Sequence, residues 1–268
     1  NILNQEEMLI DSNAYVGQWP FKHLQYNTCK ALLERMNKFG SSISVVSSLN
    51  GIFYKNTQRA NEELIDEIKS NSRFTGRFIP FAVINPIYNG WKYDFDVSVN
   101  KLGMKGIRLY PTYHGYSLAN PACVELVKLA RDRGLPVALS LRMVDNRPSS
   151  WMDIKEEWRL KDVMPIIRAV PDAKFMIVNI ANSTELNAED TKILKNANVI
   201  FDTSGRNMSN LGDLIKTYGN EKFAFGSHSP ILDYFTGLLR IEALRPEEAD
   251  EQTKKLIRSG NIKNMLKI

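Results

Sequence analysis

The chain alternates short apolar runs with amphipathic segments from one end to the other, and this alternation constrains its fold more than any other feature. The apolar runs, which we predict to be strands, are the stretch 8–17 and residues 43–48, 77–84, 106–111, 136–141, 174–179, 199–203 and 222–226. The intervening residues predict helices at 28–39, 58–70, 94–101, 120–133, 160–170, 185–195 and 210–218, followed by 231–239, 246–259 and 261–266. Strands that are apolar along their length are typical of a parallel sheet covered by helices.

Eight strand–helix units fill the chain, with no break in composition between them. This number of units in about 250 residues is that of a closed (β/α)8 TIM barrel. An open, doubly wound sheet is the alternative, but no glycine-rich phosphate-binding turn follows the first predicted strand. We therefore predict an α/β protein with a single-domain TIM barrel over residues 1–268 and C-terminal helices from about residue 231.

The charge balance favours small anionic ligands. The formal net charge is +5, and the 35 lysine and arginine residues are spread along the chain. A nucleic-acid-binding surface would need a basic stripe interleaved with aromatic residues, which the sequence lacks, whereas a mildly positive protein attracts small anions. No apolar run reaches the ~20 residues that a membrane-spanning helix requires, so we expect no membrane partner.

Cysteine usage bears on the cellular compartment. Cys29 and Cys123 lie in predicted helices far apart in sequence, so we expect two buried free thiols and no disulfide. Free thiols fit a reducing compartment, and we expect a cytoplasmic protein, for which a homo-oligomer is compatible with the sequence. The chain starts at Asn1, so an upstream segment removed by processing is compatible with it as well.

Polar side chains gather at the carboxyl ends of the predicted strands, where TIM barrels place their sites. They are Asn13, Tyr15, Asn50, Asn85, Arg108, Tyr110, His114, Ser140, Arg142, Asn179, Asn182, Asp202, Ser204, Arg206 and His228. Asn13 and Tyr15 are two residues apart on one strand and so point the same way, and we expect Asp11 to share that register. We expect the set to converge on one mouth of the barrel, with His23 overhanging it.

Several stretches resemble one known family. They are Ile10–Tyr15, Gly103–Pro111 continuing to Tyr116, Gly134–Val137, Phe225–Pro230 and the ending Ser259–Leu266. In order and spacing they are similar to the amidohydrolase-related TIM-barrel hydrolases, the "amidohydrolase 2" branch that also contains decarboxylases and lactonases. The resemblance spans nearly the whole chain and implies a hydrolase, or a related lactonase or lyase, on a TIM barrel.

The chain departs from that family at the positions that the resemblance assigns to a divalent metal. The family has a His-any-His pair where this chain has Asn13 and Tyr15, histidines where it has Ser140 and Asn179, and an aspartate where it has His228. Neutral amides and hydroxyls are poor ligands for zinc and similar metals, which prefer imidazole, thiolate or carboxylate. We predict that the chain binds no metal and uses no other cofactor.

Three readings of the site remain open. The first is a metal-free enzyme acting on a small anionic substrate. The second is a catalytically inactive barrel that binds a small anion with the same residues. The third keeps a metal through His114, His228 and Asp202.

In the enzyme reading, the proposed catalytic residues are His228, Arg108 and Asp11. His228 would be a general acid or base, since its ordinary pKa near ~6.5 allows both forms around neutrality. The proposed substrate-binding residues are Asn13, Tyr15, Tyr110, His114, Ser140, Arg142, Asn179 and Arg206. Arginines clamp carboxylates or phosphates, and amide or phenol groups donate to a developing oxyanion.

Structural roles compete with these functional ones. Asp11 could cap a backbone amide, and Arg142 and Arg206 could pair with Asp145 or Glu185 at the surface. The aromatic residues Trp19, Tyr110, Tyr113, Tyr116 and Trp151 could either close the barrel mouth or line a pocket for a ring-shaped ligand. Residues 143–158 form the longest irregular stretch and are a candidate lid.

Treatment of the purified protein with a chelator should leave its melting temperature unchanged. A metal that binds the folded state stabilises it by mass action, so its removal would lower the melting temperature. Differential scanning calorimetry with and without EDTA makes the comparison. A melting temperature that falls with EDTA and recovers with zinc or manganese would refute the prediction.

Overall fold

The computed structural model describes residues 8–140, 142–144, 152–153, 158–180, 184–205 and 210–268. Its strands are β1 (Leu9–Val16), β2 (Ser41–Ser48), β3 (Phe78–Pro80), β4 (Ala82–Val83), β5 (Ile107–Leu109), β6 (Val137–Ser140), β7 (Lys174–Val178), β8 (Asn198–Asp202) and β9 (Phe223–Ala224). All their ladders are parallel, in the orders β1-β2-β3 and β4-β5-β6-β7-β8-β9. The two sheets are the two parts of one barrel.

Residues 78–83 join the sheets on one side. β3 pairs with β2, whereas β4, one residue further along, pairs with β5. Phe81, between them, still donates its backbone N–H to the carbonyl oxygen of Val46 at 2.9 Å. Pro80 has no N–H to contribute to a ladder, which accounts for the break at this point. The stretch therefore acts as one barrel strand that changes partners.

The barrel closes between β9 and β1. The backbone N–H of Ser12 donates to the carbonyl of Phe225 at 2.8 Å, and that of His228 donates to the carbonyl of Asn13 at 2.8 Å. A parallel bridge also joins Ala14 to Ser229. With this closure, β3 and β4 count as one strand and the predicted eight-stranded parallel barrel is confirmed.

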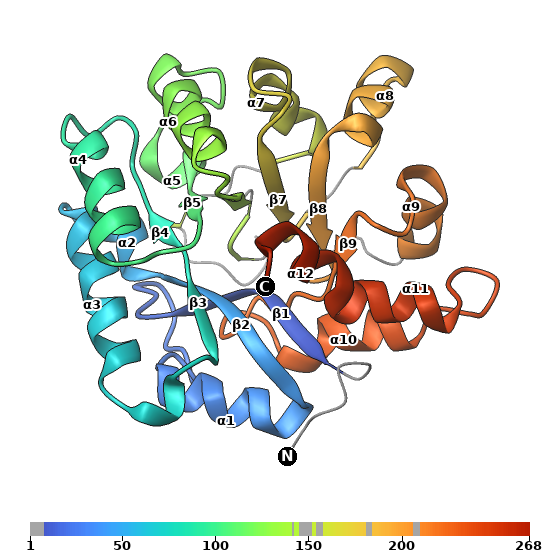
Figure 1. The fold of residues 1–268 in the computed structure, drawn as a ribbon, viewed down its shortest axis with the longest axis horizontal. Helices are drawn as coiled ribbons and strands as arrows, with labels where there is room; N and C mark the ends of the chain where they lie inside the picture. Colours follow the sequence, from blue (N-terminus) through green and yellow to red (C-terminus); the bar gives the residue numbers. More distant parts are fainter. Residues whose placement is uncertain (1–7, 141, 145–151, 154–157, 181–183, 206–209) are drawn as a thin grey trace.

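Helices form an outer layer around the strands (Figure 1). They are α1 (Cys29–Phe39), α2 (Asn50–Phe53), α3 (Thr57–Lys69), α4 (Trp91–Asp96), α5 (Pro111–His114), α6 (Pro121–Asp132), α7 (Met164–Ala169), α8 (Ala188–Asn196), α9 (Leu211–Tyr218), α10 (Tyr234–Glu242), α11 (Glu251–Lys255) and α12 (Asn261–Leu266). π-helical turns at Val97–Lys101 and Leu256–Gly260 extend α4 and join α11 to α12, and 3-10 turns lie at Ser72–Phe74 and Leu160–Val163.

Side-chain caps set several helix boundaries. Thr28 accepts from the N–H of Ala31 at 3.1 Å, so it caps α1 as its sequence position predicts. α8 begins at Ala188, three residues later than predicted, because Asn187 caps it. The predicted helix 246–259 likewise begins only at Glu251, where Asp250 is the cap. In both segments the predicted boundary followed the apolar periodicity, whereas the capping residue determines where the helix begins.

Two apolar layers flank the strands. The larger lies between strands and helices and holds the buried free thiols of Cys29 and Cys123. The smaller fills the barrel interior near the amino ends of the strands, with Ile10 and Met176 among its members. Ile262 and Met265 of α12 belong to this inner layer, so α12 plugs the amino end of the barrel.

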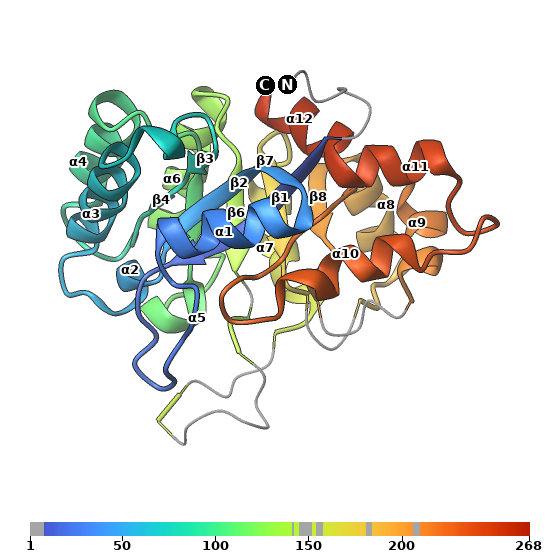
Figure 2. The ribbon, with the colours of Figure 1, turned by 90° about the horizontal axis from the view of Figure 1, so that it is seen from below.

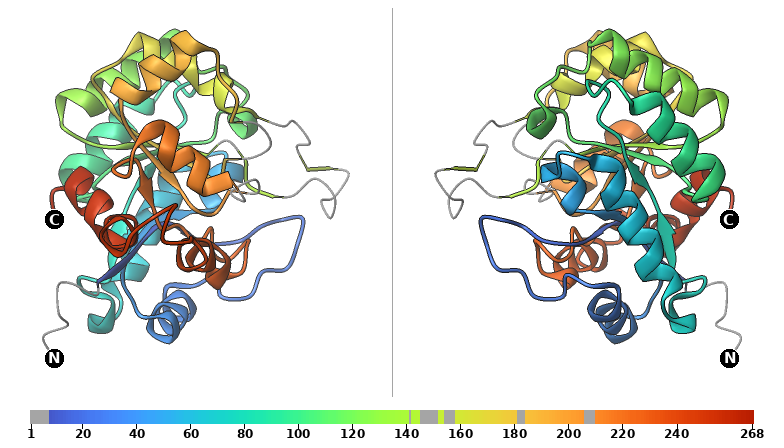
Figure 3. Two further views of the ribbon diagram at one scale, coloured as in Figure 1. Left: turned by 90° about the vertical axis from the view of Figure 1, so that its right-hand side faces the viewer. Right: turned by 90° about the vertical axis from the view of Figure 1, so that its left-hand side faces the viewer.

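The two ends of the barrel therefore differ. Figure 2 shows α12 at one end of the barrel and α2, α5 and loop 17–28 at the other, and Figure 3 shows this loop projecting away from the C-terminus. Among the described residues, no helix combines the length and apolar character needed to cross a membrane. The carboxyl ends of the strands, on the side of α2 and α5, hold the polar side chains considered next.

Candidate functional site

The guanidinium of Arg108 lies at the centre of the barrel mouth. Arg108 is on β5 and is 0% exposed. Its Nη1 donates to the oxygens of three side chains that the sequence predicted to converge: Asn13 Oδ1 at 3.1 Å, Tyr15 Oη at 2.9 Å and Ser140 Oγ at 3.2 Å. The charge also lies 4.5 Å from the ring centroid of Tyr15. β1, β5 and β6 thus meet at one nitrogen.

The other two guanidinium nitrogens differ from each other. Nε donates to Ser47 Oγ on β2 at 2.9 Å. Nη2 is buried and has no hydrogen-bond partner among the described residues. No described carboxylate forms an ion pair with Arg108. A buried cation that lacks both a counter-ion and one hydrogen bond is costly, and such groups in native proteins call for a functional explanation.

Asn13 links this cation to the nearest buried carboxylate. Its Oδ1 accepts from Arg108, while its Nδ2 donates to Asp202 Oδ2 at 2.9 Å. Asp202 also accepts from Ser204 Oγ at 2.5 Å and from the N–H of Asn179 at 2.7 Å. Burial raises the pKa of Asp202, and these three hydrogen bonds oppose that rise. The Asn13 amide therefore bridges Arg108 and Asp202 by two hydrogen bonds, one to each charged group.

His228 is held as a neutral imidazole. Its Nε2 lies 2.6 Å from the carbonyl oxygen of Met143, which can only accept, so Nε2 carries the hydrogen. Nδ1 then accepts from Asn13 Nδ2 at 3.1 Å. Burial, together with the charges of Arg108 and Arg142, lowers the pKa of His228 to about 3, although the hydrogen bond to Met143 opposes the shift. The expectation that both protonation states coexist near neutrality is therefore wrong for the folded protein.

Asp11 does not share the register of Asn13 and Tyr15. The β1 ladder shifts between Asp11 and Ala14, and this irregularity changes the alternation that the sequence predicted. The Asp11 carboxylate instead accepts from the N–H of Ser227 at 2.9 Å, from its hydroxyl at 2.5 Å and from the N–H of Asn13 at 3.0 Å. Burial raises the pKa of Asp11 to about 6. These contacts match the capping role and fix the turn that carries His228.

Other predicted residues are distributed between the mouth and its surroundings. Tyr110 is 0% exposed, and its hydroxyl has no hydrogen-bond partner within the described ranges. Arg142 is buried near His228 and its Nε donates to the carbonyl of Val144 at 3.0 Å. Asn179 donates to the carbonyl of Arg142 at 2.9 Å. Asn182, Arg206, Asp145 and Trp151 lie outside the described residues, as does most of the candidate lid 143–158.

The proposed metal set of His114, His228 and Asp202 is not brought together as ligands. His114 is on α5, where its Nε2 lies 3.2 Å from the carbonyl oxygen of Gly51 and burial lowers its pKa. Within the described part of the chain, no group of three His, Cys, Asp or Glu side chains could hold a metal ion. His23 is exposed in the loop after β1. Asn50 accepts from the backbone N–H of Gln18 in the loop after β1, and Asn85 accepts from that of Ile87 in the turn after its own strand.

Aromatic side chains pack over this polar cluster. Trp19 contacts Phe53 and Tyr113 edge to face, with centroid distances of 5.2 and 5.7 Å. Trp19, Tyr15 and Tyr110 belong to one apolar cluster above the guanidinium. Tyr116 packs in the outer core instead. Trp19, Tyr110 and Tyr113 therefore gather beside Tyr15 at the mouth, where the sequence predicted aromatic residues.

Two contacts of the site were missed in the sequence. Ser47 precedes the end of the second predicted strand, and its position in the run Ser47-Ser48 at a carboxyl end could have identified it. The carbonyl of Met143 fixes the tautomer of His228, and no side-chain pattern can reveal a backbone acceptor.

Substituting His228→Gln should make the folding stability less dependent on pH. Because the folded-state pKa of His228 is lowered to about 3, acid protonates this residue only in the unfolded chain, and stability falls as pH decreases below ~6.5. Between pH 7 and pH 5, the unmodified protein should lose about 2 kcal/mol more unfolding free energy than the variant. Urea titrations at both pH values measure this difference.

The exposed His23 provides the matched control, because His23→Gln should retain the full pH dependence. Asp11 and Asp202 are present in all three proteins, so their contributions cancel. Equal pH dependence in His228→Gln and the unmodified protein would show that His228 is not held neutral by burial.

Comparison with known proteins agrees with this architecture. A family model described as "Amidohydrolase" matches residues 42–268. No curated protein matches the chain. Among solved structures, 5-carboxyvanillate decarboxylase from Sphingomonas paucimobilis has 12% identity and a TM-score of 0.71, with 97% of this chain and 99% of that chain covered.

Two further solved structures share the fold to a similar degree. 2,6-Dihydroxybenzoate decarboxylase from Rhizobium has 13% identity and a TM-score of 0.70, over 97% of this chain and 98% of that one. A Polaromonas dihydroxybenzoic acid decarboxylase with bound manganese and the inhibitor 2-nitroresorcinol has 14% identity and a TM-score of 0.72, over 97% and 96%. At such identities these similarities concern the fold. Because the family model covers far more than half of its length, this chain belongs to the amidohydrolase family.

Proposed function

We propose that this barrel binds a small aromatic carboxylate at Arg108 without a divalent metal. The observation that carries the proposal is Nη2 of Arg108, which is buried, charged and without a partner in the part of the chain that the structure describes. A carboxylate is the natural occupant for such a group, since guanidinium nitrogens bind carboxylate oxygens in the same plane. A bound anion would also supply the counter-ion that no described side chain provides at contact distance.

The guanidinium takes the place that the family resemblance assigns to a metal. Asn13, Tyr15 and Ser140 stand at three of the metal-ligand positions in that resemblance, and all three of their oxygens accept from Nη1 of Arg108. A divalent cation at this point would face the positive charge of Arg108 and would have to displace its hydrogen bonds.

The remaining donors also fit a metal poorly. Nε2 of His228 donates to Met143, and Nδ1 is occupied by Asn13. Both carboxylate oxygens of Asp202 already accept hydrogen bonds. The residues present therefore do not fit the divalent metal of the family. The positive charge at the mouth comes from the protein itself.

The class of ligand follows from what surrounds Nη2. Tyr110 lies two residues after Arg108, just beyond the end of β5, and its hydroxyl is likewise buried and without a hydrogen-bond partner among the described residues. Together these groups offer two donors to one carboxylate. The rings of Tyr15, Tyr110 and Trp19 provide apolar faces for an aromatic ring. The similar solved structures are decarboxylases of aromatic acids, which supports the same ligand class here.

The alternative is a metal-free hydrolase, lactonase or lyase that uses His228. The position of His228 in the same cluster favours it, because Asn13 joins the imidazole to Arg108. Its lowered pKa and occupied nitrogens make it a weak base in this arrangement. Binding is therefore the better-supported function. Turnover of lactones, esters, amides or aromatic acids that is lost in His228→Gln would favour the enzyme.

Substituting Tyr110→Phe should separate binding from folding. The hydroxyl has no partner, so its removal breaks no hydrogen bond and should stabilise the free protein by about 1 kcal/mol. If the hydroxyl binds a carboxylate, affinity for 2,6-dihydroxybenzoate should fall by about fivefold or more. Urea denaturation measures stability, and isothermal titration calorimetry measures the dissociation constant.

Two controls define the outcome. The uncharged 2,6-dihydroxybenzamide should bind far more weakly than the acid, because it leaves the guanidinium unpaired. Arg108→Met should abolish binding of the acid, whereas Arg133→Met, at the exposed end of α6, should retain it. Because Arg108 makes four hydrogen bonds, circular dichroism must show that the Met variant is folded. Equal affinity for the acid and the amide would refute the proposal.

A further inference from the structure

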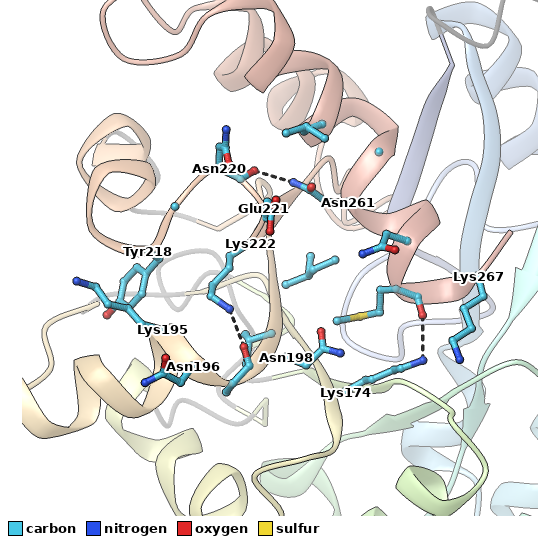
Figure 4. A pocket seen from close by; sticks show the side chains of 18 residues that line it. Lys174, Lys195, Asn196, Asn198, Tyr218, Asn220, Glu221, Lys222, Asn261 and Lys267 are labelled. Atoms are coloured by element: carbon cyan, nitrogen blue, oxygen red, sulfur yellow. Dashed lines mark hydrogen bonds between the residues drawn. The ribbon is translucent and has the colours of Figure 1, made fainter.

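A second cavity, of about 740 Å³, lies at the opposite end of the barrel from Arg108. It is bounded by the amino ends of β7, β8 and β9 and by α12 (Figure 4). Its volume falls within the range of small-molecule sites. None of the site residues predicted from the sequence lines this cavity, and Arg108 does not line it either.

The cavity is strongly basic. Lys174, Lys195, Lys222 and Lys267 line it, against the single acidic residue Glu221. None of the four lysines takes part in an ion pair with another described residue. The positive charge of this cavity is therefore not neutralised at contact distance by the part of the protein that the structure describes.

Two of these ammonium groups are held in place by backbone carbonyls. Lys222 Nζ donates to the carbonyl of Ala197 at 2.6 Å, and Lys174 Nζ donates to those of Gly134 and Met265 at 3.2 and 3.4 Å. Burial lowers the pKa of both lysines, and the charge of Lys267 adds to the effect on Lys174. Figure 4 shows Lys174 and Lys267 on the same side of the cavity.

Helix capping explains only part of this arrangement. Ala197 ends α8 and Met265 lies in the last turn of α12, so Lys222 and Lys174 complement the negative ends of two helix dipoles. No such helix-end contact offsets the mutual repulsion of Lys174 and Lys267 among the described residues. An anion between the lysines would relieve it, and each ammonium has a further N–H to donate.

Neutral donors complete the surroundings. The side-chain amides of Asn198 and Asn264 line the cavity and make no hydrogen bond to another described residue. Asn261, by contrast, is fixed by the carbonyls of Asn220 and Phe223 at 2.8 and 2.9 Å and shapes the wall. Flexible ammonium groups together with amide N–H donors suit a phosphate, whose several oxygens accept from many directions.

We propose that this cavity is a second ligand site, which binds a small molecule carrying two or more phosphate charges. Such a ligand matches the number of lysines and the volume of the cavity. The site is independent of Arg108, because the inner apolar layer of the barrel lies between the two ends. Its occupant would stabilise the contact between α12 and the strands, since Lys174 reaches from β7 to the carbonyl of Met265.

The test uses inorganic pyrophosphate as the probe on the whole chain. Pyrophosphate should raise the melting temperature, and calorimetric titration should give a saturable isotherm, whereas chloride at the same ionic strength should do neither. In Lys267→Gln and in Lys222→Gln the dissociation constant should each time rise by about fivefold or more. Lys267 is exposed, so its substitution leaves the fold intact even if that of Lys222 does not.

The controls separate this site from general attraction to a basic protein. Lys30→Gln, on the exposed face of α1, removes one charge remote from the cavity and should leave pyrophosphate affinity unchanged. Tyr110→Phe should also leave it unchanged, so a failure at the Arg108 site is distinguishable from a failure here. No saturable binding, or the same loss of affinity in Lys30→Gln as in Lys267→Gln, would overturn the proposal.

Discussion

The contact between Arg108 and Asn13 organises the mouth of this barrel. One amide oxygen accepts from the guanidinium, while the amide nitrogen of the same side chain serves Asp202 and the ring of His228. An arginine and an aspartate are thereby buried in one barrel without touching. Because Asn13 is uncharged, it satisfies hydrogen bonds of both charged groups but neutralises neither charge. No described carboxylate contacts Arg108, and its Nη2 has no described hydrogen-bond partner.

The same residues also close the barrel. Asn13 accepts the N–H of His228 with its backbone carbonyl, so the contact that fixes the imidazole belongs to the seam between β9 and β1. Asp11 strengthens this seam by accepting two hydrogen bonds from Ser227. Closure of the fold and construction of the site therefore depend on one short stretch of β1. Substitutions there should affect both together.

The fold could be predicted from the sequence because each strand of a parallel barrel is apolar on both faces and each helix carries its own periodicity. The convergence of Asn13, Tyr15, Arg108 and Ser140 followed from the rule that strand carboxyl ends share one mouth. The prediction that Asp11 shares the register of Asn13 was wrong, because the types of side chain in a strand do not reveal a shift in its ladder register. The titration of His228 failed because burial, and not residue type, sets its pKa. The lysine cavity was missed, because Lys267 joins Lys174 and Lys222, at the amino ends of their strands, only through the position of α12.

The plug formed by α12 has a consequence for how the chain matures. Ile262 and Met265 belong to the inner layer that also contains Ile10, so residues far apart in the chain share one apolar interior. The seam contacts likewise join residues 213 to 216 positions apart. Closing loops of this length costs entropy that only the finished interior repays. A ribosome-bound chain from which α12 has not yet emerged would leave this inner layer open to solvent, so the interior can close only after residue 265 has been synthesised.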